Sequence, residues 1–418
     1  MTILSQVVPS VGEPGAPSSA TAGGRPLGVR VGDLVYVGAQ VLSTAQHGST
    51  DADDIESQTQ AVFEQLTHAL HSAGAGMADL IKLHTYYQCP GDGPQVTQFW
   101  ERMTGVRLRH MADPGPAGTA VRVLGAPTRD RLIGVDGIAV VGIDKQRIMP
   151  DHAWDWSIPT PLSQGWRVGD TVFVGGQISA DRQGRAVAPD DAVAQTRNTL
   201  EYIRHVLAEA GAGWEHLVAM RICFKHSGSP REARELLATI LDEIRAVVPE
   251  PRPVLTAFGV DLLYEGLVLE IDAVAVLGGK TVVEPAGSVG WVRPEGFPTA
   301  CRVGPNLHWG AIGAPGAASL EAQAEATLER VKLTLAASGF DIADIAKVTA
   351  FFVADDDDPS FESGRRAVTA ILEAYLPAPG PVVTVVAVPG LPHEGQRFSI
   401  DGLAVRADSS NKPAPGGA

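Results

Sequence analysis

A short stretch of this chain occurs twice, and a third time in a more divergent form. The copies begin at residues 31, 168 and 303 and read VGDLVYVGAQVL, VGDTVFVGGQIS and VGPNLHWGAIGA. The interval between copies is nearly constant and is much longer than the repeat of a solenoid. Each copy is therefore predicted to belong to a separate domain with the same fold.

The same series of elements follows each copy. A turn and a strand lead into a helix with apolar residues at helical spacing, and then come a central strand, a second helix and two closing strands. The central strands are predicted at residues 80–88, 217–225 and 345–353. The first helices are expected to have the capping residues Asp53, Asp190 and Ser319 and to end at Gly74, Gly211 and Gly339. The predicted fold class is α+β, with three ββαβαββ domains.

The repeat also divides the chain. The three domains are predicted at residues 26–146, 147–280 and 281–407. Residues 1–25 and 408–418 are rich in Pro, Gly, Ser and Ala, which is typical of disordered tails.

The central strands predict how the domains associate. Side chains alternate along a strand, and one set in each copy is almost wholly apolar, as expected of a face covered by the two helices. The other set mixes polar, aromatic and apolar side chains and needs a different cover. We therefore expect the three sheets to pack together as a pseudo-threefold trimer, with sheets inside and helices outside. Small molecules would bind in the clefts between neighbouring domains.

The composition excludes several classes of partner. The chain has 418 residues and a formal net charge of -15, which argues against nucleic acid and anionic membranes because both require a surplus of Lys and Arg. Its three cysteines are widely spaced, and no apolar run approaches the ~18 residues of a membrane span. The N-terminus lacks the basic region of a signal peptide. No Walker loop, dinucleotide fingerprint or HExxH motif is present. A cytoplasmic protein with a small-molecule substrate and without cofactor or metal is expected.

These features together resemble the Rid family, the reactive intermediate deaminases that are also called YjgF-like proteins. The resemblance is carried by PLSQGW at 161–166, VGGQI at 174–178, LAEAGAGWEHLVAMRICF at 207–224 and EIDAVAV at 270–276. It implies a chorismate-mutase-like fold for each domain. Family members are usually homotrimers of ~120-residue chains, so the resemblance also implies a trimer fused into one chain, expected as a monomer or a dimer.

The resemblance implies a substrate site at each domain interface, yet most of its residues are missing. In active family members an Arg grips the substrate carboxylate, a Tyr and a Ser assist, and an acidic residue moves a proton or positions water. The matching positions hold Gly118, Leu255 and Val383 for the Arg, Leu27, Leu162 and Thr299 for the Tyr, and Gly38, Gly175 and Gly310 for the Ser. Without the Arg, deamination of 2-aminoacrylate is expected to be negligible.

The acidic position is kept in all three copies, as Asp136, Asp272 and Asp401. One interpretation makes each carboxylate a catalytic acid or base whose pKa is raised by apolar surroundings. On this interpretation Asp136 or Asp272 is favoured over Asp401, because copy 3 offers no titratable partner, and Asn at the working position should cost activity but little stability. The other interpretation is structural: each Asp bonds backbone amides across a domain interface.

Further side chains are candidates for substrate binding, namely His84, Tyr86, Arg122, Arg221, Cys223 and Phe351. All but Arg122 lie on the mixed face of the central strands. Arg122 lies on the strand face of the missing Arg and is otherwise a surface arginine. Cys223 is a nucleophile only if a base lowers its pKa, and is otherwise a small buried residue.

Three functions are compatible with the sequence. The first is an enzyme that hydrolyses, tautomerises or cyclises a small imine, enamine or carbonyl-derived metabolite, with one of the aspartates moving the proton. The second is a protein that binds a reactive small molecule without converting it. The third is a scaffold for other proteins.

Overall fold

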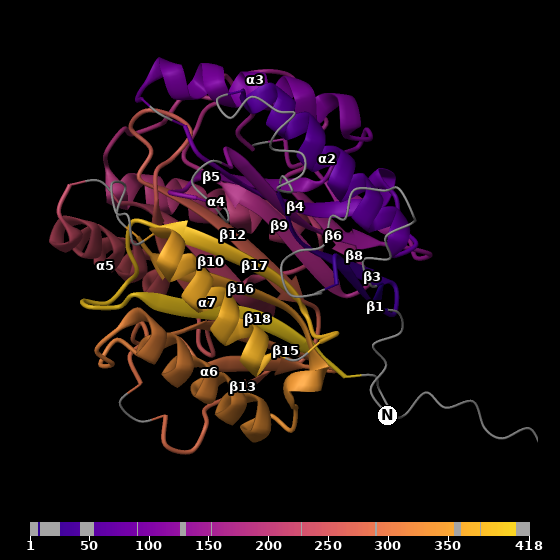
Figure 1. Cartoon of the computed structure of the whole chain (residues 1–418). Coiled ribbons are helices and arrows are strands. Elements are labelled where there is room, and N and C mark those ends of the chain that lie inside the picture. The colour runs from indigo at the N-terminus through magenta and orange to yellow at the C-terminus, as the bar shows by residue number, and fades with distance from the viewer. Residues whose placement is uncertain are drawn as a thin grey trace, which may run out of the picture.

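The computed structural model describes residues 7–8, 26–41, 54–89, 91–125, 131–151, 153–226, 228–288, 291–354, 361–376 and 378–406. Within these residues, each copy of the repeat forms a six-stranded sheet with two long helices. The helices lie on the outside of the molecule and the sheets meet in its middle (Figure 1). This is the α+β fold that the sequence predicts.

The elements follow the same order in each domain. Domain 1 contains β1 (Val7–Val8), β2 (Gly28–Val31), β3 (Leu34–Gln40), α2 (Ile55–Ser72), β4 (Leu80–Tyr87), α3 (Pro94–His110), β5 (Ala117–Arg122) and β6 (Ile133–Val140). Domain 2 contains β7 (Lys145–Ile148), β8 (Gly165–Val168), β9 (Thr171–Gln177), α4 (Ala192–Glu209), β10 (Leu217–Lys225), α5 (Pro230–Val247), β11 (Val254–Val260) and β12 (Leu269–Val276). Domain 3 contains β13 (Thr281–Val283), β14 (Ala300–Val303), β15 (Asn306–Ile312), α6 (Leu320–Ala337), β16 (Ile345–Val353), α7 (Phe361–Tyr375), β17 (Val382–Val388) and β18 (Phe398–Val405).

The three sheets share one strand order. It is β1-β2-β3-β6-β4-β5 in domain 1, and the equivalent strands follow the same order in domains 2 and 3. The central strands β4, β10 and β16 pair in parallel with β5, β11 and β17, because a helix crosses over between them, and antiparallel with the closing strands β6, β12 and β18.

Each sheet begins with a strand that the predicted ββαβαββ unit lacks. In domain 2 this strand is β7, and the predicted boundary between residues 146 and 147 falls inside it. In domain 1 it is β1, which pairs with β2 although its residues lie in the predicted tail. The remainder of residues 1–25, and all of residues 408–418, lie outside the described residues.

Short-range contacts set the ends of the first helix in each domain. The capping side chains are Asp54, Asp191 and Ser319, each of which accepts a backbone N–H of the first turn. Ser319 is as predicted, whereas the predicted Asp190 is one residue too early and the predicted Asp53 lies outside the described residues. The predicted left-handed glycines are confirmed, with φ of 76°, 72° and 76° at Gly74, Gly211 and Gly339.

The two faces of the central strands have the different environments that the sequence predicts. Phe352 of β16 packs against Phe361 of α7 in its own domain, with ring centroids 5.7 Å apart. The preceding residue, Phe351, faces the other way and stacks on Phe258 of domain 2, at 4.3 Å. Alternate side chains therefore serve the core of each domain and the contact between domains.

The contacts between the sheets close a ring. We call the contact surfaces seams: β5 meets β9 at seam 1–2, β11 meets β15 at seam 2–3, and β17 meets β3 at seam 3–1. Beyond these seams, at one end of the ring, the ends of β5, β11 and β17 join through backbone hydrogen bonds. Arg122 exchanges two such bonds with Asp261, Ala387 donates to Gly125, and Gly259 donates to Gly390. This end of the ring is thereby closed.

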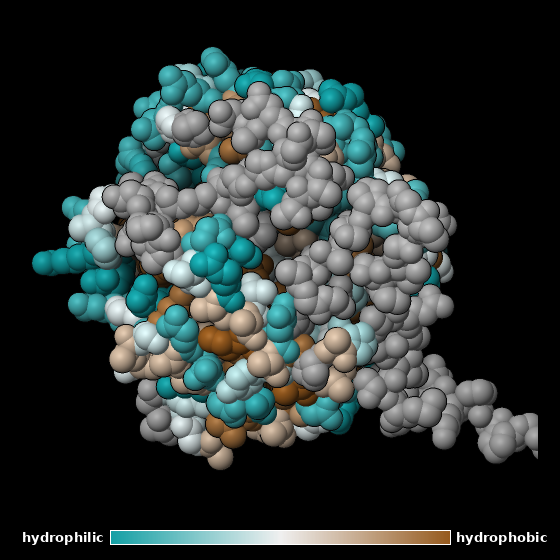
Figure 2. Space-filling model, viewed as in Figure 1, coloured by the Kyte–Doolittle hydropathy of each residue, from teal (hydrophilic) through white to brown (hydrophobic). Residues whose placement is uncertain are grey.

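The outside of the ring is mainly hydrophilic in the view of Figure 2, where hydrophilic residues cover the outward sides of α2 and α3. Apolar residues show there as small groups among hydrophilic ones, chiefly near α6 and α7. None of the helices in the described part of the chain is both long enough and apolar enough to cross a membrane.

A chain that already supplies three sheets needs no partner to cover their inner faces. We expect light scattering coupled to size-exclusion chromatography to give the mass of one or two 43.8-kDa chains. A trimer joined through the inner sheet faces would contradict this arrangement.

Candidate functional site

Three aspartates on the closing strands are each held by the preceding domain. In every case a threonine and a cation of that domain approach the carboxylate, and we call this set of contacts a clamp. Thr384 and Lys347 of domain 3 hold Asp136, Thr119 and Lys82 of domain 1 hold Asp272, and Thr256 and Arg221 of domain 2 hold Asp401. The clamps therefore run around the ring in one direction.

The geometry of the threonine contact is almost the same in all three clamps. The distances from threonine Oγ1 to carboxylate Oδ2 are 3.0 Å for Asp136, 3.0 Å for Asp272 and 2.8 Å for Asp401. All three carboxylates are buried, and Asp136 is 0% exposed. They accept side-chain rather than backbone donors, so the predicted bonds to backbone amides are replaced by bonds to threonine and cationic side chains.

The cation comes from one strand position in two copies and from another in the third. Lys82 and Lys347 occupy equivalent positions of β4 and β16, where β10 has Ala219. In domain 2 the charge is supplied two residues further on, by Arg221, whose Nη2 lies 3.0 Å from Asp401 Oδ2. The exchange keeps three cations opposite three buried carboxylates, as the cost of burying an unpaired charge requires.

His84 joins two of the clamps. Its Nδ1 lies 2.8 Å from Asp136 Oδ1, within its own domain. Its Nε2 lies 3.3 Å from Asp272 Oδ2 of domain 2, outside hydrogen-bond geometry. The ring is thus placed between the carboxylates of two domains.

The pKa values of Asp136 and Asp272 are opposite to the sequence-based expectation. Burial acts to raise the pKa of Asp136, but the charge of Lys347 and the contacts with His84 outweigh it and hold this pKa well below its usual range. For Asp272, Lys82 and His84 have the same effect. Asp136 and Asp272 are therefore ionised rather than the acids with raised pKa that were predicted.

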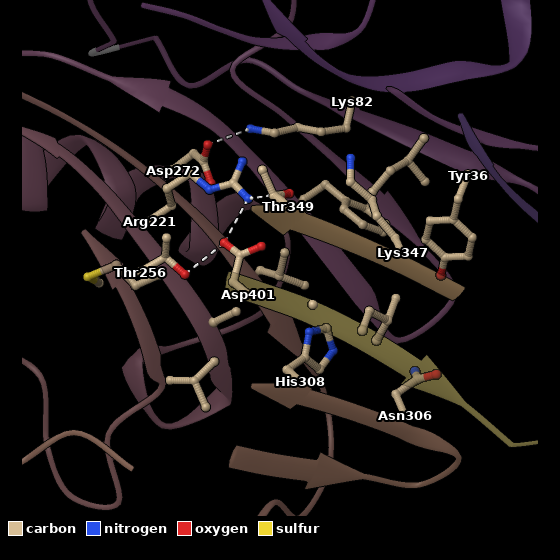
Figure 3. A pocket seen from close by; sticks show the side chains of 18 of the residues that line it. Tyr36, Lys82, Arg221, Thr256, Asp272, Asn306, His308, Lys347, Thr349 and Asp401 are labelled. Atoms are coloured by element: carbon tan, nitrogen blue, oxygen red, sulfur yellow. Dashed lines mark hydrogen bonds and ion pairs between the residues drawn. The ribbon is translucent and has the colours of Figure 1, made fainter. Parts of the chain in front are cut away.

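A cavity of about 130 Å³ lies on the ring axis beside the clamps, and we call it the axial cavity. Its inner end is formed by Lys82, Arg221, Lys347, Thr349, Asp272 and Asp401 (Figure 3). His84 also lines the cavity. Its walls include equivalent residues of the three copies, namely Leu34, Thr171 and Asn306, then Tyr36, Phe173 and His308, and also Ile138, Val274 and Leu403. Further lining residues come from domains 2 and 3 alone, namely Ala219, Met220, Val254, Thr256, Val276, Trp309 and Gly402. All three domains therefore contribute to the wall.

The seams, in contrast, are tightly packed where the family resemblance places its substrate sites. A Cβ added to Gly38 would lie 3.1 Å from the carbonyl oxygen of Val383, one added to Gly175 would lie 3.2 Å from that of Gly118, and one added to Gly310 would lie 2.5 Å from that of Leu255. In each of these contacts, the glycine stands at the position of the missing Ser, and its neighbour stands at the position of the missing Arg in the preceding domain. At seam 2–3 a pocket of only about 20 Å³ is left.

Comparison with known proteins identifies the family of the repeated domain. A sequence model of the endoribonuclease L-PSP family matches residues 18–141 and 157–277, which together make up more than half of the chain. The chain belongs to the Rid (endoribonuclease L-PSP) family. The third copy, which is the most divergent, lies outside both matched ranges.

Two curated relatives match this Rid protein over about the length of one domain, and one solved structure matches a larger part of it. A RutC family protein of Pyrococcus abyssi is 28% identical over 115 residues, which are 28% of this chain and 85% of the relative. The 3-aminoacrylate deaminase RutC of Acinetobacter baylyi is 27% identical over 134 residues, which are 31% of this chain and 97% of the relative. A solved chorismatase structure covers 78% of this chain and 93% of its own, with a TM-score of 0.49 and 15% identity.

The structure brings some of the predicted site residues of this Rid protein together and leaves others apart. Of the predicted residues, Asp272, Asp401, His84 and Arg221 line the axial cavity. Asp136 lies behind His84 and does not line it. The other predicted binding residues are Tyr86, Phe351, Cys223 and Arg122, none of which lines the axial cavity.

The four predicted binding residues outside the cavity are held by apolar packing or by ion pairing. Tyr86, Cys223 and Phe351 are buried in one apolar core cluster. Burial and the nearby carboxyl of Glu270 raise the pKa of Cys223 well above its usual value, so the thiol stays protonated. Arg122 pairs with Asp261 and donates to the carbonyl oxygens of Cys89 and Gly91, at the closed end of the ring.

Glu270 is a buried acid that the sequence analysis did not identify. It is 6% exposed and accepts the backbone N–H of Ala120 across seam 1–2. Burial and the charge of Asp272 raise its pKa from 4.5 to about 8. Gly134 and Ser399 stand at the equivalent positions of the other closing strands, so this acid exists in one seam alone.

The clamp predicts a large cost for removing one cation. Replacing Arg221 by Met leaves Asp401 buried without its cation, and we expect the free energy of unfolding to fall by about 3–5 kcal/mol in urea denaturation. Lys225→Met, on the same strand, is the matched control: it removes an ion pair with Asp190, whose side chain is 69% exposed, and should change stability by less than about 1 kcal/mol. Equal effects of the two substitutions would contradict the clamp. For the same reason, we expect Asn in place of a clamped Asp to lower stability, because the buried cation then loses its countercharge.

Glu270 predicts a dependence of stability on pH. The unfolded chain releases this proton near pH 4.5, whereas the folded protein keeps it until about pH 8. This residue therefore makes the free energy of unfolding fall as pH rises between these values. Glu270→Gln should remove that part of the fall, so that the variant gains stability relative to the wild type from pH 5 to pH 9 in parallel urea titrations. A constant difference over this range would show that Glu270 has an ordinary pKa.

Proposed function

We propose that this Rid protein converts a small imine, enamine or carbonyl-derived metabolite by proton transfer, and that the reaction takes place in the axial cavity rather than at the seams. The supporting observation is the position of His84. It lines the cavity and lies between the carboxylates of Asp136 and Asp272. A histidine held by a carboxylate and exposed to a cavity is a common arrangement for moving protons near neutral pH.

Asp136, His84 and Lys347 each have a separate part in this proposal. Asp136 does not reach the cavity, and its role is to position the His84 ring through Nδ1. His84 Nε2, which is buried and has no hydrogen-bond partner in the described part of the chain, is the atom that carries the proton. Lys347 lines the cavity and stabilises the negative charge that develops on a carbonyl or enolate oxygen. These parts suit tautomerisation, or hydrolysis of a C=N bond by a water that enters with the substrate.

Two observations narrow the choice of substrate. One relative is named as a 3-aminoacrylate deaminase, which supports an enamine or a related imine as the substrate class. The guanidinium that family members use for the substrate carboxylate is missing from all three seams, where Gly118, Leu255 and Val383 occupy its positions. Deamination of 2-aminoacrylate at a seam is therefore not part of the proposal.

A second candidate function is binding without conversion, in which the protein shields or carries a reactive molecule. It is favoured by the pairing of all three aspartates, since a carboxylate engaged by a threonine and a cation is a weak base. The scaffold function has no comparable support. The axial cavity, of about 130 Å³, has room for a small molecule but not for part of another protein.

Solvent deuterium exchange distinguishes conversion from binding without a known product. We expect the protein, in D₂O, to exchange the hydrogens next to the carbonyl of one or more members of a panel of compact, uncharged ketones and their imines, as measured by proton NMR. His84→Gln should slow this exchange by about 10²–10⁴-fold, the usual contribution of a general acid or base.

The same substitution at His68, on the exposed side of α2, is the control and should leave the rate unchanged. Circular dichroism verifies that both variants are folded. Binding of the panel without exchange would favour the carrier function, and exchange that is unaffected by His84→Gln would exclude His84 as the proton carrier.

A further inference from the structure

The axial cavity is continuous with a second pocket at one of its ends. This wider pocket, of about 370 Å³, lies outside it and shares Leu34, Thr171, Phe173 and Asn306 with it. The other end is formed by the clamps, beyond which lie the layer of Phe351 and Phe258 and the backbone bonds between the strand ends. A molecule therefore enters from the side of the β2–β3, β8–β9 and β14–β15 turns, and its leading end meets the clamps.

The dimensions of the cavity restrict the molecule to about one ring. Its volume of about 130 Å³ is slightly below the ~150 Å³ of a protein cavity that holds benzene. The walls are largely apolar, with Ile138, Val274 and Leu403 on the closing strands and the rings of Tyr36, Phe173 and His308 on the β3, β9 and β15 strands. Flat aromatic rings favour a planar guest.

Several polar atoms at the cavity lack partners within the described part of the chain. Asp401 receives both of its donors, Arg221 and Thr256, on Oδ2, and Asp272 likewise receives its contacts on Oδ2. The Oδ1 atoms of both carboxylates are therefore left as acceptors. Lys347 uses one bond, to Asp136, and retains N–H groups to donate. Asp272, Asp401 and Lys347 are each less than 10% exposed, so these atoms depend on the cavity for partners.

The residues that carry this acceptor and this donor, Asp401 and Lys347, are neighbours on paired strands of domain 3. Asp401 of β18 stands opposite Thr349 of β16, and Lys347 is two residues from Thr349 on the same face. Such diagonal neighbours have Cα atoms about 7–8 Å apart. Both side chains border the cavity in Figure 3. One small molecule that both donates and accepts satisfies the two of them together.

The charge of the site favours a neutral molecule. The three clamped carboxylates are balanced by Lys82, Lys347 and Arg221. Burial lowers the pKa of His308 to about 4, so this ring adds no charge near pH 7. An anion would leave the Asp401 acceptor without a donor, and a cation would leave the Lys347 donors without an acceptor.

We infer that the axial cavity takes a compact, planar, neutral molecule that carries an N–H donor beside a C=O acceptor, as in lactams and vinylogous amides. Its polar edge contacts Asp401 Oδ1 and Lys347 Nζ, and its body lies between Tyr36, Phe173 and His308. This inference deepens the proposed function, which places the reaction in the same cavity, by naming the class of substrate. Enamines conjugated to a carbonyl belong to that class.

Matched one-ring probes test the inference. The probes are 2-pyridone, which has the donor and the acceptor side by side, N-methyl-2-pyridone, which has lost the donor, and aniline, which lacks the carbonyl acceptor. We expect 2-pyridone to bind at least about tenfold more tightly than either of the others in ligand-observed NMR titrations of the full chain.

Leu403→Phe locates the binding. It fills the cavity from a wall residue outside the clamps and should abolish binding of 2-pyridone, whereas Leu333→Phe, on the exposed side of α6, should leave it unchanged. Equal affinity for the three probes, or no binding of any, overturns the inferred class. Binding that survives Leu403→Phe overturns the location. Exchange in D₂O that depends on His84, found together with equal affinities, overturns the inferred class alone and leaves the proposed function in place.

Discussion

The structure depends on three buried carboxylates that no domain satisfies by itself. A charge taken out of water is costly unless a countercharge and hydrogen bonds replace the solvent. Asp136, Asp272 and Asp401 each find both in the preceding domain, as a threonine hydroxyl and a Lys or Arg side chain. This requirement couples every domain to the one before it and sets the direction of the ring. It also explains why the lysine position of β10 was free to become Ala219 once Arg221 supplied the charge.

Fusion of the copies into one chain has consequences for where a ligand can bind. In a homotrimer the three seams are identical, whereas here each position can change in one copy alone. At the seams, glycine and aliphatic residues at the former Ser and Arg positions let the strands approach to backbone contact. On the axis, one equivalent position holds a different residue in each copy, namely Tyr36, Phe173 and His308. The lining of the axial cavity is therefore asymmetric. These differences are the basis for placing the proposed site on the axis of the ring rather than at the seams.

The sequence predicts the domains well because its signals are local. The central strands were expected at residues 80–88, 217–225 and 345–353 and are found within one residue of these bounds, since alternation and helical spacing are readable over short windows. The clamps were not predicted, although Thr119, Thr256 and Thr384 recur in all three copies, because their partners come from another domain. From the sequence, a raised pKa was expected for the aspartates. In the structure it is Glu270, two residues before Asp272, whose pKa is raised. Strand alternation places both on one face, and only three-dimensional packing decides which one meets a lysine.

In this protein the seams are closed at the positions of the missing Ser and Arg, and the open apolar space lies on the axis of the ring. Xenon enters apolar cavities of this size and is visible by its anomalous scattering, so a crystal of the full chain under xenon pressure tests this arrangement directly. We predict a xenon site in the axial cavity, between Tyr36 and Leu403, and none beside Gly118, Leu255 or Val383. Xenon bound at those seam positions, with the axis empty, would contradict the account.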